Sequence, residues 1–214
     1  MVQNTSMAVM QNRKEPNSSL DDFPTPPWAT RALCDWISHT GGEPYKLTCR
    51  EPAANRGHMV VPLLEYFRTV EASDVHDYGA GFPVVDYLFG PPPAAVDWTI
   101  TNPPFRLAAQ FIDRALQTSR IGSAVIVRSA FLEGVGRYNK LFNVCPPTDI
   151  LQFSERVVMH KGKLSAKGST ATAYCWLVWN KYDNRGSTRF HWIPPCRKLL
   201  ELSSDYPEND EVVE

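Results

Sequence analysis

The sequence contains few cysteines and no long apolar run. Its 214 residues include five cysteines that lie far apart, and none of them forms a C-x-x-C pair. Neither a disulfide framework nor a thiolate zinc site is therefore indicated, and a reducing cytoplasm is the expected compartment. No apolar stretch approaches the roughly 20 residues that a membrane helix needs, so we expect no membrane partner. The first residues also lack the charged-then-apolar pattern of a signal peptide.

Metal-binding patterns are missing as well. The histidines at positions 58, 76 and 160 do not form an H-x-x-x-H pair, and no carboxylate facial pattern accompanies them. The sequence therefore predicts no metal site.

Charge is unevenly distributed along the chain although the formal net charge is only −1. Residues 120–200 contain 13 Lys and Arg residues and 4 Asp and Glu residues, a net charge of +9. Residues 201–214 contain no Lys or Arg and 6 Asp and Glu residues, a net charge of −6. A basic stretch favours a polyanionic partner. The other interpretation is a set of ordinary solvated faces, because closeness in sequence does not establish closeness in space.

The length fits one globular domain with short appendages. We expect a flexible N-terminal segment over residues 1–20, a single domain over residues 21–198 and an acidic C-terminal tail over residues 199–214.

Apolar periodicity predicts an alternation of strands and helices. Helices are expected at residues 25–40, 58–69, 106–119 and 136–144, and strands at residues 45–49, 70–74, 81–90, 96–101, 122–129, 149–153 and 170–182. This alternation indicates an α/β domain with a mainly parallel sheet. Such sheets bind ligands at the carboxyl ends of their strands.

A stiff tetrapeptide, Asn-Pro-Pro-Phe at residues 102–105, follows one of these strands. The prolines fix φ and cannot continue a ladder, so the neighbouring amide, carbonyl and ring are held in one geometry. The Asn102 side-chain oxygen and the Pro103 carbonyl can each accept one N–H of an amine, and Phe105 offers a face for a base. The alternative interpretation is a helix start with Pro at its first positions.

Together with "EPAANRG" after an earlier strand, "NPPF" resembles the S-adenosylmethionine-dependent amino-methyltransferases. It is most similar to the DNA adenine-N6 methyltransferases, in the single-domain form found in phages and prophages, over roughly residues 23–180. The resemblance implies a Rossmann-like class I methyltransferase fold, a mainly parallel seven-stranded sheet with an antiparallel last strand. It implies S-adenosylmethionine as the cofactor, and methyl transfer to the exocyclic N6 amine of adenine in DNA. It also implies catalytic roles for Asn102, Pro103, Pro104 and Phe105.

The resemblance further implies a set of cofactor-binding residues. Thr25 and Pro26 match the motif that contacts the methionine end, with Phe23 and Trp28 as walls. A helix N-cap at Thr25 with Pro at the next position is an equally good interpretation of this pair. The first cofactor loop contributes Glu51, Pro52, Ala53, Asn55 and Gly57. Asn55 stands where the family has its first glycine, and Asn is the non-glycine residue that best tolerates a positive φ.

Two acids follow later strands of the expected sheet. Asp74 is implied to bind the ribose hydroxyls, with Asp77 as a rival three residues later. Asp86 is implied to accept from the adenine amino group, and Tyr87 to pack on that adenine.

A basic connection between the last two expected strands points to nucleic acid. Lys161, Lys163 and Lys167 of this connection, together with Arg137 of the expected helix at residues 136–144, are the candidate phosphate contacts, with DNA as the expected partner and RNA as an alternative. The family often has an aromatic side chain here that sandwiches the base, and residues 157–173 contain no Phe, Tyr or Trp. Only about 34 residues follow Asn180, so no sizeable recognition domain is present in the sequence. Target specificity and oligomeric state stay open, with a homodimer among the alternatives.

Two rival functions stay open on the sequence alone. The first is methylation of a different amine, such as cytosine N4, an RNA base or a protein glutamine. The second is a non-catalytic nucleic-acid-binding relic of the fold.

Overall fold

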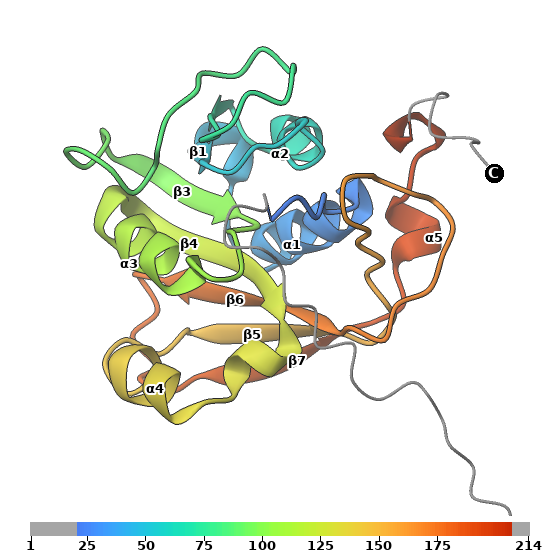
Figure 1. Ribbon diagram of the computed structural model, residues 1–214. Helices are drawn as coiled ribbons and strands as arrows, with labels where there is room; N and C mark the ends of the chain where they lie inside the picture. Colours follow the sequence, from blue (N-terminus) through green and yellow to red (C-terminus); the bar gives the residue numbers. More distant parts are fainter. Residues whose placement is uncertain (1–20, 207–214) are drawn as a thin grey trace, which may run out of the picture.

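The computed structural model describes residues 21–206, so the expected N-terminal segment 1–20 and residues 207–214 lie outside the described residues. The described chain forms one seven-stranded sheet with helices on both faces (Figure 1). The strands are β1 (Thr48–Glu51), β2 (Thr69–Ala72), β3 (Val96–Thr101), β4 (Ser119–Arg128), β5 (Asp149–Phe153), β6 (Tyr174–Asn180) and β7 (Arg189–Ile193). The helices are α1 (Pro27–His39), α2 (Val60–Tyr66), α3 (Ala108–Thr118), α4 (Val135–Arg137) and α5 (Arg197–Leu200), with short helical turns at Pro44–Lys46, Ser129–Leu132, Tyr138–Phe142 and Ser203–Asp205.

The strands lie in the order β2-β1-β3-β4-β6-β5-β7. All neighbouring pairs are parallel except the two that involve β6, which is antiparallel to both β4 and β5. The carboxyl ends of the other six strands therefore meet at one edge of the sheet. This is the edge where open parallel sheets bind their ligands.

The middle of the sheet is buried on both faces, which explains the continuous apolar run of β4. Ala124 and Ile126 pack into a core formed with α1 and α2, whereas Val125 and Val127 pack into a second core with Ile112 of α3. Alternate residues of a strand point to opposite faces, so one apolar strand supplies both cores.

The α/β architecture and the antiparallel strand predicted from the sequence are confirmed, with two differences in detail. The antiparallel strand is β6, the last strand that the pattern predicted, but a further edge strand, β7, follows it and pairs with β5. The expected strand at residues 81–90 does not form. Only one bridge, between Asp74 and Val84, remains there. Pro83 and the prolines at 91–93 lack the N–H groups that a ladder needs.

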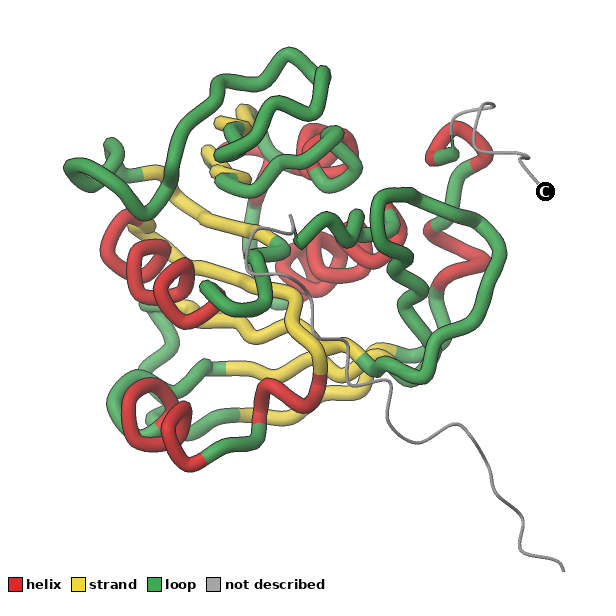
Figure 2. Tube along the Cα trace, in the orientation of Figure 1, coloured by secondary structure: helices red, strands yellow, loops and turns green. Residues whose placement is uncertain are grey.

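Two long loops border the carboxyl edge of the sheet. Figure 2 shows them in green as the connections between β2 and β3 and between β5 and β6. The second loop is the basic connection singled out in the sequence.

The acidic segment expected from residue 199 onward begins inside the fold. α5 packs on α1, and the Asp205 carboxylate accepts two hydrogen bonds from the guanidinium of Arg31, a buried residue of α1. The part of the expected tail up to residue 206 is therefore anchored by a buried ion pair.

Candidate active site

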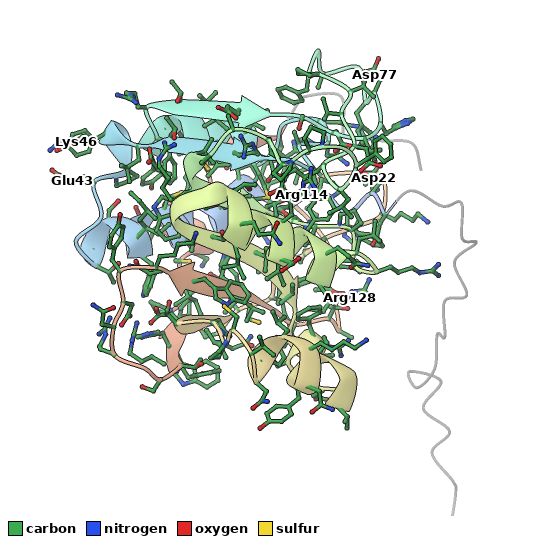
Figure 3. The ribbon with its side chains drawn as sticks, turned by 90° about the vertical axis from the view of Figure 1, so that its left-hand side faces the viewer. Asp22, Glu43, Lys46, Asp77, Arg114 and Arg128 are labelled. Carbon is green, nitrogen blue, oxygen red and sulfur yellow. The ribbon has the colours of Figure 1, made fainter. Side chains whose placement is uncertain are left out.

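A cavity of about 200 Å³ lies at the carboxyl edge of the sheet, between the residues that follow β1, β2 and β3 and those that precede α1. The residues predicted from the sequence that line it are Thr25, Pro52, Ala53, Asn55, Asp74, Asp86, Tyr87, Asn102 and Pro104. Among the predicted catalytic and cofactor-binding residues, those that do not line it are Pro26, Glu51, Gly57, Pro103 and Phe105. Figure 3 shows Asp22, Asp77 and Arg128 on one side of the molecule and the Glu43–Lys46 ion pair on the opposite side.

The turn after β1 has the backbone geometry of a glycine-rich loop. Asn55 has a φ of 51° and is the only non-glycine residue with a positive φ among residues 21–206. Gly57 has a φ of 89°, and a Cβ atom there would lie 3.1 Å from the Phe82 ring. Asn55 thus takes the conformation expected of a glycine substitute, and a side chain at Gly57 would be strained by the positive φ and crowded against Phe82.

Glu51, the last residue of β1, is completely buried. Its Oε1 accepts hydrogen bonds from the Ala53 N–H at 2.9 Å and from the Thr101 hydroxyl at 2.6 Å. Its Oε2 is buried without a hydrogen-bond partner. Because burial penalises the charged form, the pKa of the Glu51 carboxyl is raised to about 8. A buried acceptor with no partner, directly next to three residues that line the cavity, fits a cationic or hydrogen-bonding ligand group.

The pKa of Glu51 makes stability depend on pH. Between the ordinary value of 4.5 and about 8, the folded protein holds a proton that the unfolded chain releases. The free energy of unfolding therefore falls as the pH rises through this window, by about 1.4 kcal/mol for each pH unit well inside it. Glu51→Gln stays neutral, so we expect it to be more stable than the wild type at pH 9. The difference should shrink toward pH 4.

Urea unfolding at several pH values measures this difference. A variant with the same pH dependence as the wild type would show that Glu51 ionises freely in the folded protein. Glu133→Gln is a suitable control, because Glu133 is an exposed residue outside the sheet.

Asp74, which follows β2, is buried and helps to hold the loop after β1. Its carboxylate accepts from the Asn55 N–H at 2.9 Å and from the His76 N–H at 3.0 Å. The rival residue, Asp77, is exposed, accepts from the Gly79 N–H and does not line the cavity. Of these two acids, only Asp74 therefore lies where it could contact a ligand in the cavity.

Asp86 and Tyr87 lie at the cavity although their segment is not a strand. The exposed Asp86 carboxylate accepts from the Leu88 N–H at 2.9 Å. The buried Tyr87 ring lies 5.2 Å from Phe111 of α3, and its hydroxyl is 3.2 Å from the Thr118 hydroxyl. Tyr87 is thus a fixed aromatic wall beside a solvated carboxylate.

The Asn102 side chain is held in one orientation at the end of β3. Its Nδ2 donates to the Phe23 carbonyl at 2.8 Å and to the Thr25 hydroxyl at 2.9 Å. Both donor positions are therefore used, while within residues 21–206 no group donates to the Asn102 Oδ1 or to the Pro103 carbonyl. The Asn102 oxygen, at the cavity, and the carbonyl of the next residue are the pair of acceptors predicted for holding an amine.

The residues after Asn102 do not form the first turn of a helix. Pro103 is buried, Pro104 lines the cavity, and α3 begins only at Ala108 after a turn closed by the Leu107 N–H and the Pro104 carbonyl at 2.8 Å. Phe105 is half-buried, and its ring centroid lies 5.4 Å from that of Phe23.

Thr25 and its neighbours also differ from a capped helix start. The N-cap of α1 is Pro26 and has no side-chain cap, with Pro27 at the first helical position. The Thr25 hydroxyl instead accepts from Asn102. Trp28, expected as a cavity wall, packs in the core against Phe153, because it belongs to the inward face of α1.

Two acidic residues missed by sequence reasoning connect the parts of the site. Asp21 lines the cavity, and its carboxylate accepts from the Phe105 N–H at 2.5 Å. The Asp22 carboxylate accepts from Asn55 Nδ2 at 2.7 Å and pairs with Arg56, while its carbonyl accepts from the Gly162 N–H of the basic loop. In the sequence, only their position immediately before "FPTPP" pointed to this site, and that position does not indicate which groups the two carboxylates contact.

The predicted phosphate contacts have different surroundings. The Arg137 guanidinium donates to the Phe131 carbonyl at 2.7 Å and also to the carbonyls of Ala130 and Glu133, so it closes the turn before α4. Lys161, Lys163 and Lys167 are exposed on the loop between β5 and β6, and the contact between Gly162 and Asp22 brings this loop to the cavity edge.

Other kinds of site are not found in the described chain. Among residues 21–206, no three His, Cys, Asp or Glu side chains gather as a metal site. Over the same residues, every helix is too short or too polar to cross a membrane.

Comparisons with known proteins identify the class of fold. No protein-family profile and no curated protein matches the chain. A solved structure described as a class I S-adenosylmethionine-dependent methyltransferase from Listeria monocytogenes matches with a TM-score of 0.64 and 12% identity, over 81% of this chain and 67% of that one. The methyltransferase subunit of a type I restriction-modification system from Streptococcus thermophilus matches with a TM-score of 0.61 and 11% identity, over 80% of this chain and 48% of that one.

A smaller protein is also similar. A structure described as an RNA methyltransferase from Pyrococcus horikoshii matches with a TM-score of 0.59 and 17% identity, over 78% of this chain and 90% of that one. The chain therefore has the fold of class I S-adenosylmethionine-dependent methyltransferases. It spans about half the length of the restriction-modification subunit.

Proposed function

We propose that the protein transfers a methyl group from S-adenosylmethionine to the exocyclic N6 amine of adenine in DNA. The observation that carries this proposal is the orientation of Asn102. Its amide nitrogen is held by Phe23 and Thr25, which leaves its own oxygen as an acceptor at the cavity and the carbonyl of the next residue, Pro103, as the second acceptor.

These acceptors match the chemistry of an adenine amine. Its nitrogen is a poor nucleophile because its lone pair is delocalised into the ring. Two neutral acceptors, one for each N–H, favour a pyramidal nitrogen and stabilise the positive charge that develops on it. The nitrogen then bonds to the methyl carbon as the carbon–sulfur bond breaks with its electron pair left on sulfur, and it finally releases one proton to solvent.

The residues around the cavity fit the proposed cofactor. When bound, S-adenosylmethionine supplies a methyl group activated by a positive sulfur. Glu51 precedes the cavity-lining Pro52, and its unpartnered Oε2 would suit the cofactor's ammonium group, whose positive charge would favour the ionised carboxylate. The carboxylates of Asp74 and Asp86, which line the cavity, would suit hydroxyl and amino donors. The Tyr87 ring provides an apolar wall for a planar base. Asn55 keeps the loop after β1 in the backbone conformation that lets a ligand approach closely.

DNA is the substrate that the surface and one comparison favour. The exposed lysines at 161, 163 and 167 lie on a loop tied to the cavity edge, and such side chains can contact a phosphate backbone. The similarity to a restriction-modification methyltransferase subunit agrees with this choice.

An RNA base amine is the second candidate. The chain is comparable in length to the Pyrococcus structure, of which it covers 90%, and that structure is described as an RNA methyltransferase. The same acceptors would serve either nucleic acid, so the identity of the methylated nucleoside separates the two candidates.

Cofactor binding separates an enzyme from a non-catalytic relic, and Asp86 offers a sharp test. Removing the Asp86 carboxylate leaves a cofactor amino group without its acceptor, so we expect Asp86→Ala to weaken S-adenosylmethionine binding about tenfold, a cost typical of a lost hydrogen bond at a binding site. Isothermal titration calorimetry measures the affinity.

Asp77→Ala is the matched control for this prediction. Both carboxylates are exposed, both accept a single backbone N–H in a local turn, and only Asp86 lines the cavity. We expect Asp77→Ala to bind like the wild type. Equal affinities in all three proteins would remove Asp86 from the cofactor site, and a wild type that binds no cofactor would reject the proposed function.

A further inference from the structure

Arg128 lies directly over the Phe105 ring, the stacking face that the sequence predicts for the target base. The guanidinium carbon is 3.9 Å from the centroid of the Phe105 ring and 5.8 Å from that of Phe23. Arg128 is the last residue of β4 and is exposed, and β4 pairs with β3, the strand that leads into Asn102. Figure 3 shows Arg128 on the same side of the molecule as Asp22.

This stacking leaves no room for a base between the two groups. Stacked bases are spaced about 3.4 Å apart, so a base between two planes needs about 7 Å. A base that stacks on Phe105 must therefore move the guanidinium outward by about 3 Å. Arg128 can make this movement by side-chain rotation, because it is exposed and no carboxylate among residues 21–206 forms an ion pair with it. The polar contact that this rotation breaks is a hydrogen bond with the Tyr174 side chain.

Few other planar side chains are available to stack on the outer face of a base, the face that points away from Phe105. Residues 157–173, which border the cavity edge through the contact between Gly162 and Asp22, contain no Phe, Tyr or Trp. A guanidinium is planar, stacks on aromatic faces and carries a charge that suits nucleic acid. An exposed cation–π contact is also weak enough for base stacking to replace it.

We propose that Arg128 is a positioning residue that forms the second wall of the target-base site. In the free protein the guanidinium covers the Phe105 ring. On substrate binding it rests on the outer face of the base, which then lies between Phe105 and Arg128. This inference rests on the proposed function, since it takes the adenine whose amine is held by Asn102 to stack on Phe105.

The test uses the full-length protein and a pool of short single-stranded DNAs with 2-aminopurine at the centre between two abasic sites, so that the analogue has no neighbouring base to stack on in the free strand. This adenine analogue loses fluorescence when it is stacked, and a single strand needs no base extrusion. We expect the wild type to bind the pool and to quench the fluorescence. Arg128→Ala and Arg128→Lys should bind about tenfold more weakly and quench less, because both lack the planar group. Arg128→Trp restores a plane without charge and should quench like the wild type.

Two controls make the result specific. Arg68→Ala removes one exposed positive charge at the opposite edge of the sheet, just before β2, and should behave like the wild type. All titrations are compared at one salt concentration, because phosphate contacts depend on it.

The outcomes separate this inference from the proposed function. Wild-type behaviour of Arg128→Lys would mean that Arg128 acts as a charge on phosphate, and it would overturn the proposal. An unquenched wild-type complex would overturn it as well. Transfer of labelled methyl groups to the same strands, with 2-aminopurine replaced by adenine, is measured separately. Quenching by the wild type without methyl transfer would reject the proposed function and retain the stacking role of Arg128.

Discussion

Replacement of Asn102 by alanine should lower methyl transfer by a factor on the order of 10²–10³, the cost typical of one lost transition-state hydrogen bond. The variant lacks the oxygen that accepts one N–H of the attacking amine. The fold should persist, because Asn102 is only partly buried and follows the last residue of β3, so its side chain is outside the buried strand. S-adenosylmethionine binding should change little, since the proposed cofactor contacts come from other residues. Initial rates with labelled cofactor measure the effect.

A surface asparagine serves as the matched control for Asn102. Asn143→Ala removes the same side chain at an exposed position after the helical turn Tyr138–Phe142, and it should keep full activity. If folded Asn102→Ala transferred methyl groups at a rate close to that of the wild type, the acceptor of the amine would lie elsewhere.

Replacement of Arg31 by leucine should cost the protein about 3–5 kcal/mol of stability, as expected when one partner of a buried ion pair is removed. The Arg31 guanidinium donates to both oxygens of Glu65 at 2.7 Å, to both oxygens of Asp205 at 2.8 Å and to the Leu200 carbonyl at 2.8 Å. These partners raise the pKa of the Arg31 guanidinium, mainly through the hydrogen bonds with Glu65 and Asp205. Without Arg31, the nearly buried Asp205 carboxylate and the Leu200 carbonyl lose their shared donor.

Thermal unfolding measures this loss, and a second ion pair provides the control. For a chain of this size each kcal/mol corresponds to about 2–4 °C in Tm, so the midpoint should fall by roughly 10 °C. Lys46→Leu breaks the exposed pair with Glu43 and should leave Tm almost unchanged. The double variant Arg31→Leu with Asp205→Leu should recover part of the loss, because no buried charge remains. A single variant as stable as the wild type would mean that residues 197–206 do not depend on this contact.

The sequence was most informative where local backbone chemistry decides the structure. Asn55 was expected to substitute for a glycine, and its φ of 51° agrees. Asp74, Asp86 and Asn102 were expected at the carboxyl ends of successive strands, and all three line one cavity. Asp86 lies at the cavity although the expected strand around it does not form, because the bridge between Asp74 and Val84 holds this segment beside β2.

Local sequence patterns could not predict contacts between segments that lie far apart in the chain. The two hydrogen bonds that orient Asn102 come from residues 77 and 79 positions away. Arg137 was assigned to phosphate from its charge alone, whereas its guanidinium donates to nearby carbonyls. β7 was missed because its alternate residues Phe190 and Trp192 are exposed, which hides the usual pattern of a half-buried strand.

The most direct measurement of the central claim is the identity of the methylated product. The wild-type protein and Asn102→Ala are incubated with methyl-labelled S-adenosylmethionine and with separate pools of DNA, RNA and protein, and the digested products are analysed as nucleosides and amino acids. We predict label in N6-methyladenine from the DNA pool with the wild type, and at least a hundredfold less with Asn102→Ala. Label in another amine, or no label in any pool from a folded protein that binds the cofactor, would contradict the proposed function.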